Sequence, residues 1–338
     1  MKQIIECIPN FSEGRDINVI NQIAKAIKSV HNVSLLHLDI GYDANRTVMT
    51  FAGEPNAVVE SAFRAIQMAS QLIDMSNHKG EHPRIGATDV CPLVPISGIS
   101  MKEVVSLSYQ LASRIGGELN IPIFCYEESA LQPHKRNLAN CRKGEYEGIE
   151  EKLLNRLWEP DYGPKVWNKR SGISIIGARK FLIAFNATLD TENVSIAKEM
   201  AQNIRTTGRR DKDSKECIPG LFKELKAIGW YMSEYRAAQI SMNLTDFNVT
   251  GIHTVIEEIK KQARKHNCQL KGSELIGLIP LKAILDAGIY YAKNNTSNLT
   301  QQELIHMASK NLLLNYHERF NPDNRIIEYA IRSRQIDF

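Results

Sequence analysis

The sequence IIECIPNFSE at residues 4–13 decides how the rest of the chain is interpreted, because FLIAFNATLD at residues 181–190 repeats its pattern. Each stretch is a short run of strand-forming residues that leads into a polar loop. Apolar residues then recur every three or four positions over residues 16–29 and again over residues 192–205, which predicts a helix after each stretch. One structural unit is therefore expected twice in this chain.

Both halves continue with two strand patterns and a helix pattern. These lie at residues 33–39, 47–52 and 56–74 in the first half and at residues 227–233, 237–244 and 252–266 in the second. A further strand, near residues 121–127 and 272–278 respectively, completes a β-α-β-β-α-β order. We predict an α+β fold of two similar α/β-layered, ferredoxin-like subdomains, each with mostly antiparallel strands and helices on one face.

The first half contains an additional helix pattern at residues 100–118. Residues 129–172 are poor in strand signals and rich in Gly and Pro, so they predict a long connection with one helix near residues 148–157. The boundary between the halves falls near residue 178. We therefore expect subdomains at residues 1–178 and 179–329, followed by a tail at residues 330–338. Sheets covered on one face can stack through the other, and the crevice between them would suit an extended small ligand.

Composition narrows the functional classes. A chain of 338 residues with 43% hydrophobic residues favours two subdomains over one compact domain. The net charge of +4, from 42 basic and 38 acidic residues, does not indicate a nucleic-acid-binding protein. The longest apolar runs fall short of the roughly 20 residues of a membrane span, and the N-terminus lacks the apolar core of a signal peptide. Six scattered cysteines without a Cys-x-x-Cys pair suggest free thiols in the cytoplasm.

Residues 74–89, with the sequence DMSNHKGEHPRIGATD, carry the densest collection of reactive side chains. Two histidines, a lysine, an arginine and three carboxylates lie around Gly80 and Pro83, which favour a loop over a helix. Loops of this kind often carry binding and catalytic groups. His78 and His82 have a helical metal-ligand spacing, but the glycine and proline disrupt such a helix, so no metal site is expected.

Ten short motifs stand in order along nearly the whole chain: ECIPNFSEG at residues 6–14, NRTV at 45–48, QLIDMS at 71–76, HKGEHPR at 78–84, DVCP at 89–92, GARKFLIAFN at 177–186, GWY at 229–231, VTGIHTV at 249–255, GLIPLKA at 277–283 and RIIEY at 325–329. Together they resemble the formiminotransferase family. The family transfers a formimino group from N-formiminoglutamate to tetrahydrofolate. The resemblance implies two stacked subdomains with a ligand tunnel between them, and a homodimer.

The resemblance assigns the catalytic histidine of the family to His82. A histidine can accept the proton that folate N5 loses and then donate one to the departing glutamate nitrogen, since its usual pKa is about 6.5. The alternative is a loop histidine in an ordinary hydrogen bond. Asp39, at a strand end, could orient His82 or hold the cationic amidinium of the substrate. It could equally be a turn-forming residue in the sequence Asp-Ile-Gly.

Five other residues near the matched motifs are candidate ligands. Asn10 and Asn45 lie at strand ends, and Asn45 could serve only as a turn residue. Arg46, Lys79 and Arg84 are candidates for binding the carboxylates of the substrate, because an arginine fork matches a carboxylate with two hydrogen bonds. Most lysines and arginines are merely solvated, but these three lie close in sequence to the proposed base.

Residues 162–172 resemble, by position, the segment of the family that contacts folate. This sequence is more basic than the family pattern, which would suit a polyglutamate tail, although a flexible connector is the alternative interpretation. The expected folate-binding residues are Gly163, Pro164, Lys165, Val166, Trp167, Asn168, Lys169, Arg170, Ser171 and Gly172. Neither a Walker A pattern nor Gly-x-Gly-x-x-Gly is found, so no nucleotide cofactor is expected.

The resulting hypothesis is a cytoplasmic glutamate formimidoyltransferase of histidine breakdown, with tetrahydrofolate as co-substrate and no metal. Two alternatives remain: formyl transfer from N-formylglutamate to tetrahydrofolate, and a folate-binding protein without catalysis. In vertebrate relatives the transferase is fused to a cyclodeaminase. Nine residues follow the last matched motif, so we expect this chain to release 5-formiminotetrahydrofolate and to leave deamination to another protein.

Overall fold

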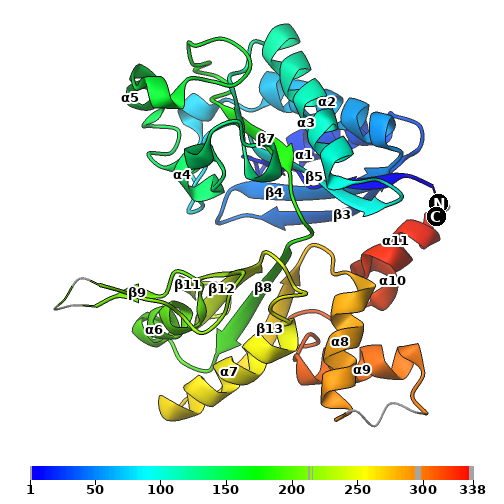
Figure 1. The fold of residues 1–338 in the computed structure, drawn as a ribbon, viewed down its shortest axis with the longest axis vertical. Helices are drawn as coiled ribbons and strands as arrows, with labels where there is room; N and C mark the ends of the chain where they lie inside the picture. Colours follow the sequence, from blue (N-terminus) through cyan, green and yellow to red (C-terminus); the bar gives the residue numbers. More distant parts are fainter. Residues whose placement is uncertain (1, 212–213, 215, 294–297, 335–338) are drawn as a thin grey trace. The chain divides into compact units, whose positions relative to one another are not determined.

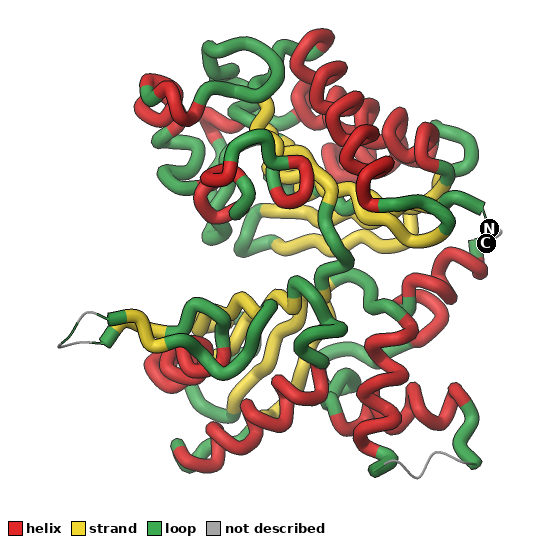
Figure 2. The backbone as a smooth tube through the Cα atoms, viewed as in Figure 1, coloured by secondary structure: helices red, strands yellow, loops and turns green. Residues whose placement is uncertain are grey.

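The computed structural model describes residues 2–211, 214, 216–293 and 298–334, which form two compact units (Figure 1). One unit contains the chain up to Lys180 together with the segment that begins at Ile331, and the other is Phe181–Ala330. Each unit has its own sheet and its own apolar core, and Figure 2 shows helices and strands in both. The chain is thus a mixed α+β protein with two sheet-containing subdomains.

The first unit contains a seven-stranded sheet. Its strands are β1 (Ile4–Cys7), β2 (Asn10–Phe11), β3 (Val33–Gly41), β4 (Arg46–Gly53), β5 (Thr88–Ser97), β6 (Ile123–Cys125) and β7 (Ser174–Ala178). The order across the sheet is β3-β4-β2-β5-β7-β6, and β1 also pairs with both β4 and β5. The β5–β7 and β6–β7 pairings are parallel, and the others are antiparallel.

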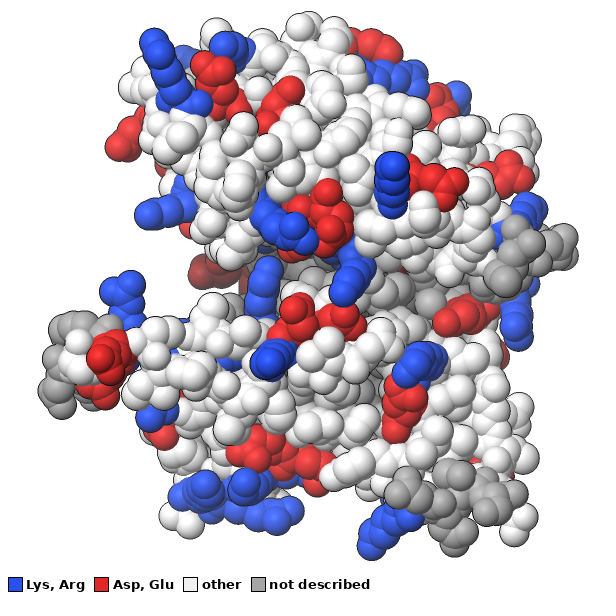
Figure 3. Space-filling view, in the orientation of Figure 1, with Lys and Arg blue, Asp and Glu red and all other residues white. Residues whose placement is uncertain are grey.

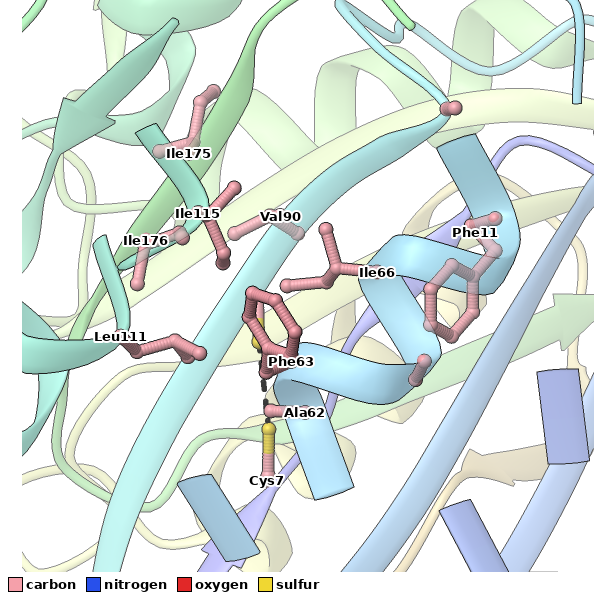
Figure 4. Close-up of a cluster of buried hydrophobic side chains, with 14 of the residues drawn as sticks. Cys7, Phe11, Ala62, Phe63, Ile66, Val90, Leu111, Ile115, Ile175 and Ile176 are labelled. Atoms are coloured by element: carbon pink, nitrogen blue, oxygen red, sulfur yellow. Dashed lines mark hydrogen bonds between the residues drawn. The ribbon is translucent and has the colours of Figure 1, made fainter. Parts of the chain in front are cut away.

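Three helices cover one face of this sheet: α1 (Ile17–Lys28), α2 (Pro55–Leu72) and α3 (Met101–Glu118). Figure 4 shows Phe63 and Ile66 of α2 packed among residues of α3 and the strands, with Cys7 close by. The sulfur atoms of the buried residues Cys7 and Cys91 are 3.5 Å apart. Met49 and Phe51 of β4 belong to this core. Because side chains alternate along a strand, Arg46 and Val48 lie on the opposite face, away from α1, α2 and α3; we call this the helix-free face with respect to these three helices.

One predicted correspondence is wrong. The strand expected near residues 121–127 exists as β6, but β5 takes the place in the sheet that β13 (Leu270–Ile276) takes in the second unit. Residues 88–97 contain Pro92 and Pro95, which weaken the strand signal because proline cannot donate to a sheet ladder. Strand β7, which lies between β5 and β6, was also not expected from the sequence.

The connection, residues 129–172, is built from short helical segments that line one end of the first unit. The connection contains helices α4 (Leu138–Arg142) and α5 (Ile149–Leu154) and the 3₁₀ turns Pro133–Lys135 and Arg156–Trp158. Two further 3₁₀ turns in the first unit are Met75–Asn77 and Glu127–Ser129. Helix α5 and the 3₁₀ turn after it correspond to the helix predicted near residues 148–157. Helix α4 is too short to show a periodic pattern.

The second unit repeats the first in simpler form. Its elements are β8 (Ile183–Leu189), α6 (Val194–Ile204), β9 (Arg209–Arg210), β10 (Cys217–Ile218), β11 (Leu225–Met232), β12 (Ala237–Leu244), α7 (Ile252–Lys265), β13, α8 (Leu281–Tyr291), α9 (Gln301–Asn311) and α10 (Pro322–Arg325). Helix α11 (Ile327–Ser333) begins in this unit, and its residues from Ile331 belong to the first unit. The antiparallel order β11-β12-β8-β13 matches β3-β4-(β1, β2)-β5. Residues 330–333 of the expected tail are helical, and residues 335–338 lie outside the described part of the chain.

Candidate active site

Arg46 begins β4 on the helix-free face and is held there by a tight turn. Asn45 has a positive φ of 46°, which asparagine tolerates better than most residues, and its backbone N–H donates to the carbonyl of Tyr42. Its side chain accepts from the Gly14 N–H and donates to the Lys79 carbonyl, both at 2.9 Å. Asn45 is therefore a turn residue that also ties the charged loop to the start of β4.

The guanidinium of Arg46 joins three segments of the first unit. It donates to Asn10 Oδ1 through Nε at 3.1 Å and through Nη2 at 2.7 Å, and to Asp89 Oδ2 through Nη1 at 2.6 Å. Nη1 also lies 3.2 Å from His82 Nδ1. Asp39 lies opposite Val48 on β3, diagonal to Arg46 and on the same face. The structure thus brings Asn10, Arg46 and His82 together, with Asp39 nearby.

Asp89 is fully buried and lies between two arginines. Besides Arg46, it accepts from Arg142 Nε at 3.2 Å and from Arg142 Nη2, and Oδ1 also accepts from the Ile85 N–H. Burial by itself would raise the pKa of Asp89, but Arg142 and Arg46 outweigh it and lower the pKa to about 2. Burial lowers the pKa of Arg46 to about 10, so it remains charged at neutral pH.

His82 is neutral in this environment. Burial and the charges of Arg46 and Arg142 lower its pKa to about 3. Nδ1 has two neighbours that require opposite tautomers: the Pro83 carbonyl at 2.7 Å can only accept, and Arg46 Nη1 at 3.2 Å can only donate. The tautomer that satisfies the shorter contact, to Pro83, carries the proton on Nδ1 and leaves the lone pair on Nε2. In this tautomer Nε2 can take a proton from a bound molecule. The arrangement of His82 is suited to general-base chemistry.

His78 and Arg84 form a second, structural pair. The imidazole of His78 donates through Nε2 to the Asn45 carbonyl at 2.9 Å and accepts through Nδ1 from Arg84 Nε at 3.2 Å. The other N–H groups of Arg84 reach the His78 carbonyl, Glu145 and Glu147, the last at 2.6 and 2.7 Å. All five donors of Arg84 are occupied within the protein, whereas Lys79 is exposed. Carboxylate binding by either side chain stays a prediction.

The loop of residues 163–172 is fixed at both ends. At one end Gly163 has a φ of 82°, and a Cβ there would lie 2.5 Å from the Ile121 carbonyl. At the other end, Ala87 N–H donates to the Ser171 carbonyl and Met75 N–H to the Arg170 carbonyl. The latter end therefore lies beside the charged loop that carries His82.

Side chains of the same loop differ in how firmly they are held. Asn168 Oδ1 accepts from the N–H groups of Arg170 and Ser171, and Trp167 packs on Tyr146 with ring centres 5.3 Å apart. The side chain of Arg170 donates to the Gln71 carbonyl. Lys165 is 72% exposed and pairs with Glu159, and Val166 is 74% exposed. Pro164, Lys169 and Gly172 complete the loop, and Lys169 is exposed.

Sequence reasoning missed two residues of this site, Asp89 and Arg142. Asp89 stands in the matched motif DVCP, and a single carboxylate entering an apolar run is a signal that could have identified it. Arg142 lies in the connection, far along the chain, and carries no local signal. We refer to Asn10, Arg46, His82, Asp89 and Arg142 as the central cluster.

Among the described residues, no group of three or more His, Cys, Asp and Glu side chains is placed to hold a metal ion. Within the same part of the chain, no helix is both long and apolar enough to span a membrane. Basic and acidic side chains alternate over the face shown in Figure 3.

Comparison with known proteins defines the class to which this fold and cluster belong. Residues 4–179 match the formiminotransferase domain, N-terminal subdomain, and residues 184–332 match the formiminotransferase domain. Together these matches cover nearly the whole chain. The chain belongs to the formiminotransferase domain family.

Individual relatives agree with this assignment. A glutamate formimidoyltransferase of Streptococcus pyogenes serotype M1 is 45% identical over 291 residues, which are 86% of this chain and 94% of the relative. A glutamate formimidoyltransferase of Thermoplasma acidophilum is 40% identical over 294 residues, 86% and 93% of the two chains. The formimidoyltransferase-cyclodeaminase of Mus musculus is 46% identical over 332 residues. These cover 98% of this chain but 60% of that relative, so this chain spans less than two thirds of the longer proteins.

Proposed function

We propose that this protein is a glutamate formimidoyltransferase, which moves the formimino group of N-formiminoglutamate to N5 of tetrahydrofolate and releases glutamate. The observation that carries the proposal is a neutral His82, with Nε2 available as a base, next to a cluster of two arginines and one carboxylate. Two relatives of similar length with this activity in their names support it.

In the proposed reaction, N5 attacks the formimino carbon and His82 Nε2 accepts the N5 proton. The tetrahedral intermediate collapses when His82 returns this proton to the departing glutamate nitrogen. A histidine with a pKa near 3 is a weak base at neutral pH. Carboxylates of the bound substrates would offset the charges of Arg46 and Arg142 and raise the pKa of His82 toward the useful range.

The remaining site residues have proposed supporting roles. Asn10 holds the plane of the Arg46 guanidinium, and Asp39 would attract the cationic amidinium of the donor. The loop of residues 163–172 would contact folate, and its exposed Lys165 and Lys169 would attract a polyglutamate tail. The ferredoxin-like details, the ligand tunnel, the homodimer and the cytoplasmic location stay predictions.

The alternatives differ in measurable ways. A formyl donor has the same glutamate part as a formimino donor and differs by oxygen in place of NH, so the central cluster by itself fits both. A non-catalytic folate-binding protein would not need an imidazole nitrogen with a free lone pair among buried charges. The names of the relatives favour the formimino donor.

His82→Ala tests the proposed role directly. We expect turnover to fall by a factor on the order of 10²–10⁴, because proton transfer contributes to the transition state. Folate affinity, measured by titration calorimetry, should change little. Near-normal turnover by a folded variant would contradict a catalytic His82. Equal loss of turnover and of folate affinity would point to binding alone. Exposed His31→Ala serves as the matched control.

A further inference from the structure

Arg142 is presented to the central cluster by a braced segment of the connection. It is the last residue of α4, and the Lys152 ammonium donates to the carbonyls of Asn140, Cys141 and Lys143 at 3.0, 2.6 and 2.8 Å. The same ammonium lies over the ring of Trp158, 4.1 Å from its centre. A cation that holds the last carbonyls of a helix is favourable, and here it fixes the backbone on both sides of Arg142.

The guanidinium of Arg142 is anchored on one side and available on the other. Nε and Nη2 donate to the two oxygens of Asp89. Nη1 makes no hydrogen bond or ion pair with the residues that the structure describes, and the side chain is 15% exposed. Arg84, the other candidate fork, has all its donors occupied. Arg142 is thus a preoriented arginine whose Nη1 presents two N–H groups without a partner among the described residues.

The charges of the cluster indicate what those N–H groups would bind. Within the central cluster, Arg46 and Arg142 contribute two positive charges and Asp89 one negative charge, while His82 is neutral. Asp39 of β3 lies outside the cluster, diagonal to Arg46. The excess positive charge lies in a largely buried region, where an uncompensated charge is costly. A carboxylate that accepts from Arg142 Nη1 would complete the neutralisation with a charge-assisted hydrogen bond.

We propose that Arg142 binds a carboxylate of the amino-acid part of the donor and of the released glutamate, a role that rests on the proposed function. Asp89 is then a positioning residue, which holds Arg142 and Arg46 in fixed relation. Asp89 holds both Arg142, which would bind the carboxylate, and Arg46, which lies beside His82. The donor is thereby oriented relative to the base, and ligands without that carboxylate are discriminated against.

The test uses glutamate and its two monoamides, glutamine and isoglutamine, as probes of each carboxylate in titration calorimetry. Arg142→Met should weaken glutamate binding by a factor on the order of 10 to 100. The monoamide that lacks the contacted carboxylate should bind the variant and the unmodified protein alike, and the other should weaken in parallel with glutamate. Arg142→Lys, which keeps a charge for Asp89, should lose affinity less. Arg136→Met, an exposed arginine of the same connection, is the control.

The outcomes separate the two levels of the proposal. Equal weakening of glutamate and both monoamides would show that Arg142 only supports the site, and unchanged binding would exclude it; either result overturns the inference. Unmodified protein that binds glutamate but does not turn over the donor would contradict the proposed function and leave the carboxylate contact standing. Protein that binds neither glutamate nor the donor would overturn both.

Discussion

At the scale of single residues, Asp89 determines the chemistry of the site. It is the shared acceptor of Arg46 and Arg142, and both guanidiniums lower the proton affinity of His82. Without a buried carboxylate between them, two arginines could not stay close together in a region of low dielectric constant. The Asp89 side chain therefore fixes the position of Arg46, which lies beside His82, and of Arg142, which is proposed to bind the substrate carboxylate.

Asp89→Asn should destabilise the first unit, because it leaves two largely buried guanidiniums without a counter-charge. The expected loss is about 3 kcal/mol in the free energy of unfolding, measured with urea. The pKa of Asp89 is about 2 in the folded protein and 3.8 in an unfolded chain. The ionised carboxylate therefore contributes to the free energy of unfolding above pH 4, and this contribution is lost as the pH falls from about 4 to 2. The variant should show a weaker dependence on pH in that window. An unchanged urea midpoint would contradict this account.

Much of the central cluster could be predicted from residues in matched motifs. Asn10, Arg46 and His82 each stand in a short motif, and the structure brings them within hydrogen-bonding distance or close to it. The use of Arg84 could not be anticipated, because its partners Glu145 and Glu147 lie in the connection, where the chain shows no periodic pattern. Arg142 was missed for the same reason.

At the scale of elements, two loops and the connection hold one another in place. The end of the 163–172 loop accepts backbone hydrogen bonds from the N–H groups of Met75 and Ala87, and Tyr146 of the connection donates to the Lys169 carbonyl at 2.5 Å. Gly80 permits the charged loop to lie against the turn before β4, since a Cβ there would be 2.3 Å from the Ala44 carbonyl. Such mutual bracing keeps loop residues in the fixed geometry that catalysis requires.

Lys165→Gln with Lys169→Gln should weaken binding of polyglutamylated folate more than that of monoglutamyl folate. Both side chains are exposed, so their attraction for a polyanionic tail should be modest and should decrease with added salt. Fluorescence titrations with the two folates at low and high salt measure the difference. Exposed Lys102→Gln with Lys25→Gln is the control. Equal effects on both folates would mean that this loop does not contact the tail.

The elements that sequence reasoning missed have identifiable causes. The strand β5 contains two prolines and begins with two polar residues, so neither alternation nor an uninterrupted apolar run marks it. The short strand β7 ends at the boundary expected near residue 178, so its residues were interpreted as part of the link between the units and not as a strand. Long amphipathic helices such as α1, α2 and α7, by contrast, were found because their apolar spacing is repeated over several turns.

At the scale of the whole molecule, a repeat organises the chain. In both sheets the first strand of the unit lies in the interior, with β1 between β4 and β5 and β8 between β12 and β13, and both sheets carry helices on one face. The first unit adds α3, β6, β7 and the connection to this plan. The central cluster depends on that addition, since Arg142, Glu145 and Glu147 belong to the connection. The repeat supplies the framework, and the insertion supplies part of the site.

In the proposed reaction, this chain transfers an intact formimino group to folate. The most direct measurement incubates the purified 338-residue protein with tetrahydrofolate and N-formiminoglutamate labelled with ¹⁵N in the formimino nitrogen. We expect unlabelled glutamate and labelled 5-formiminotetrahydrofolate in equal amounts, with little turnover of N-formylglutamate in a parallel reaction. Labelled ammonia that appears as fast as glutamate, or preferential use of the formyl donor, would contradict the account.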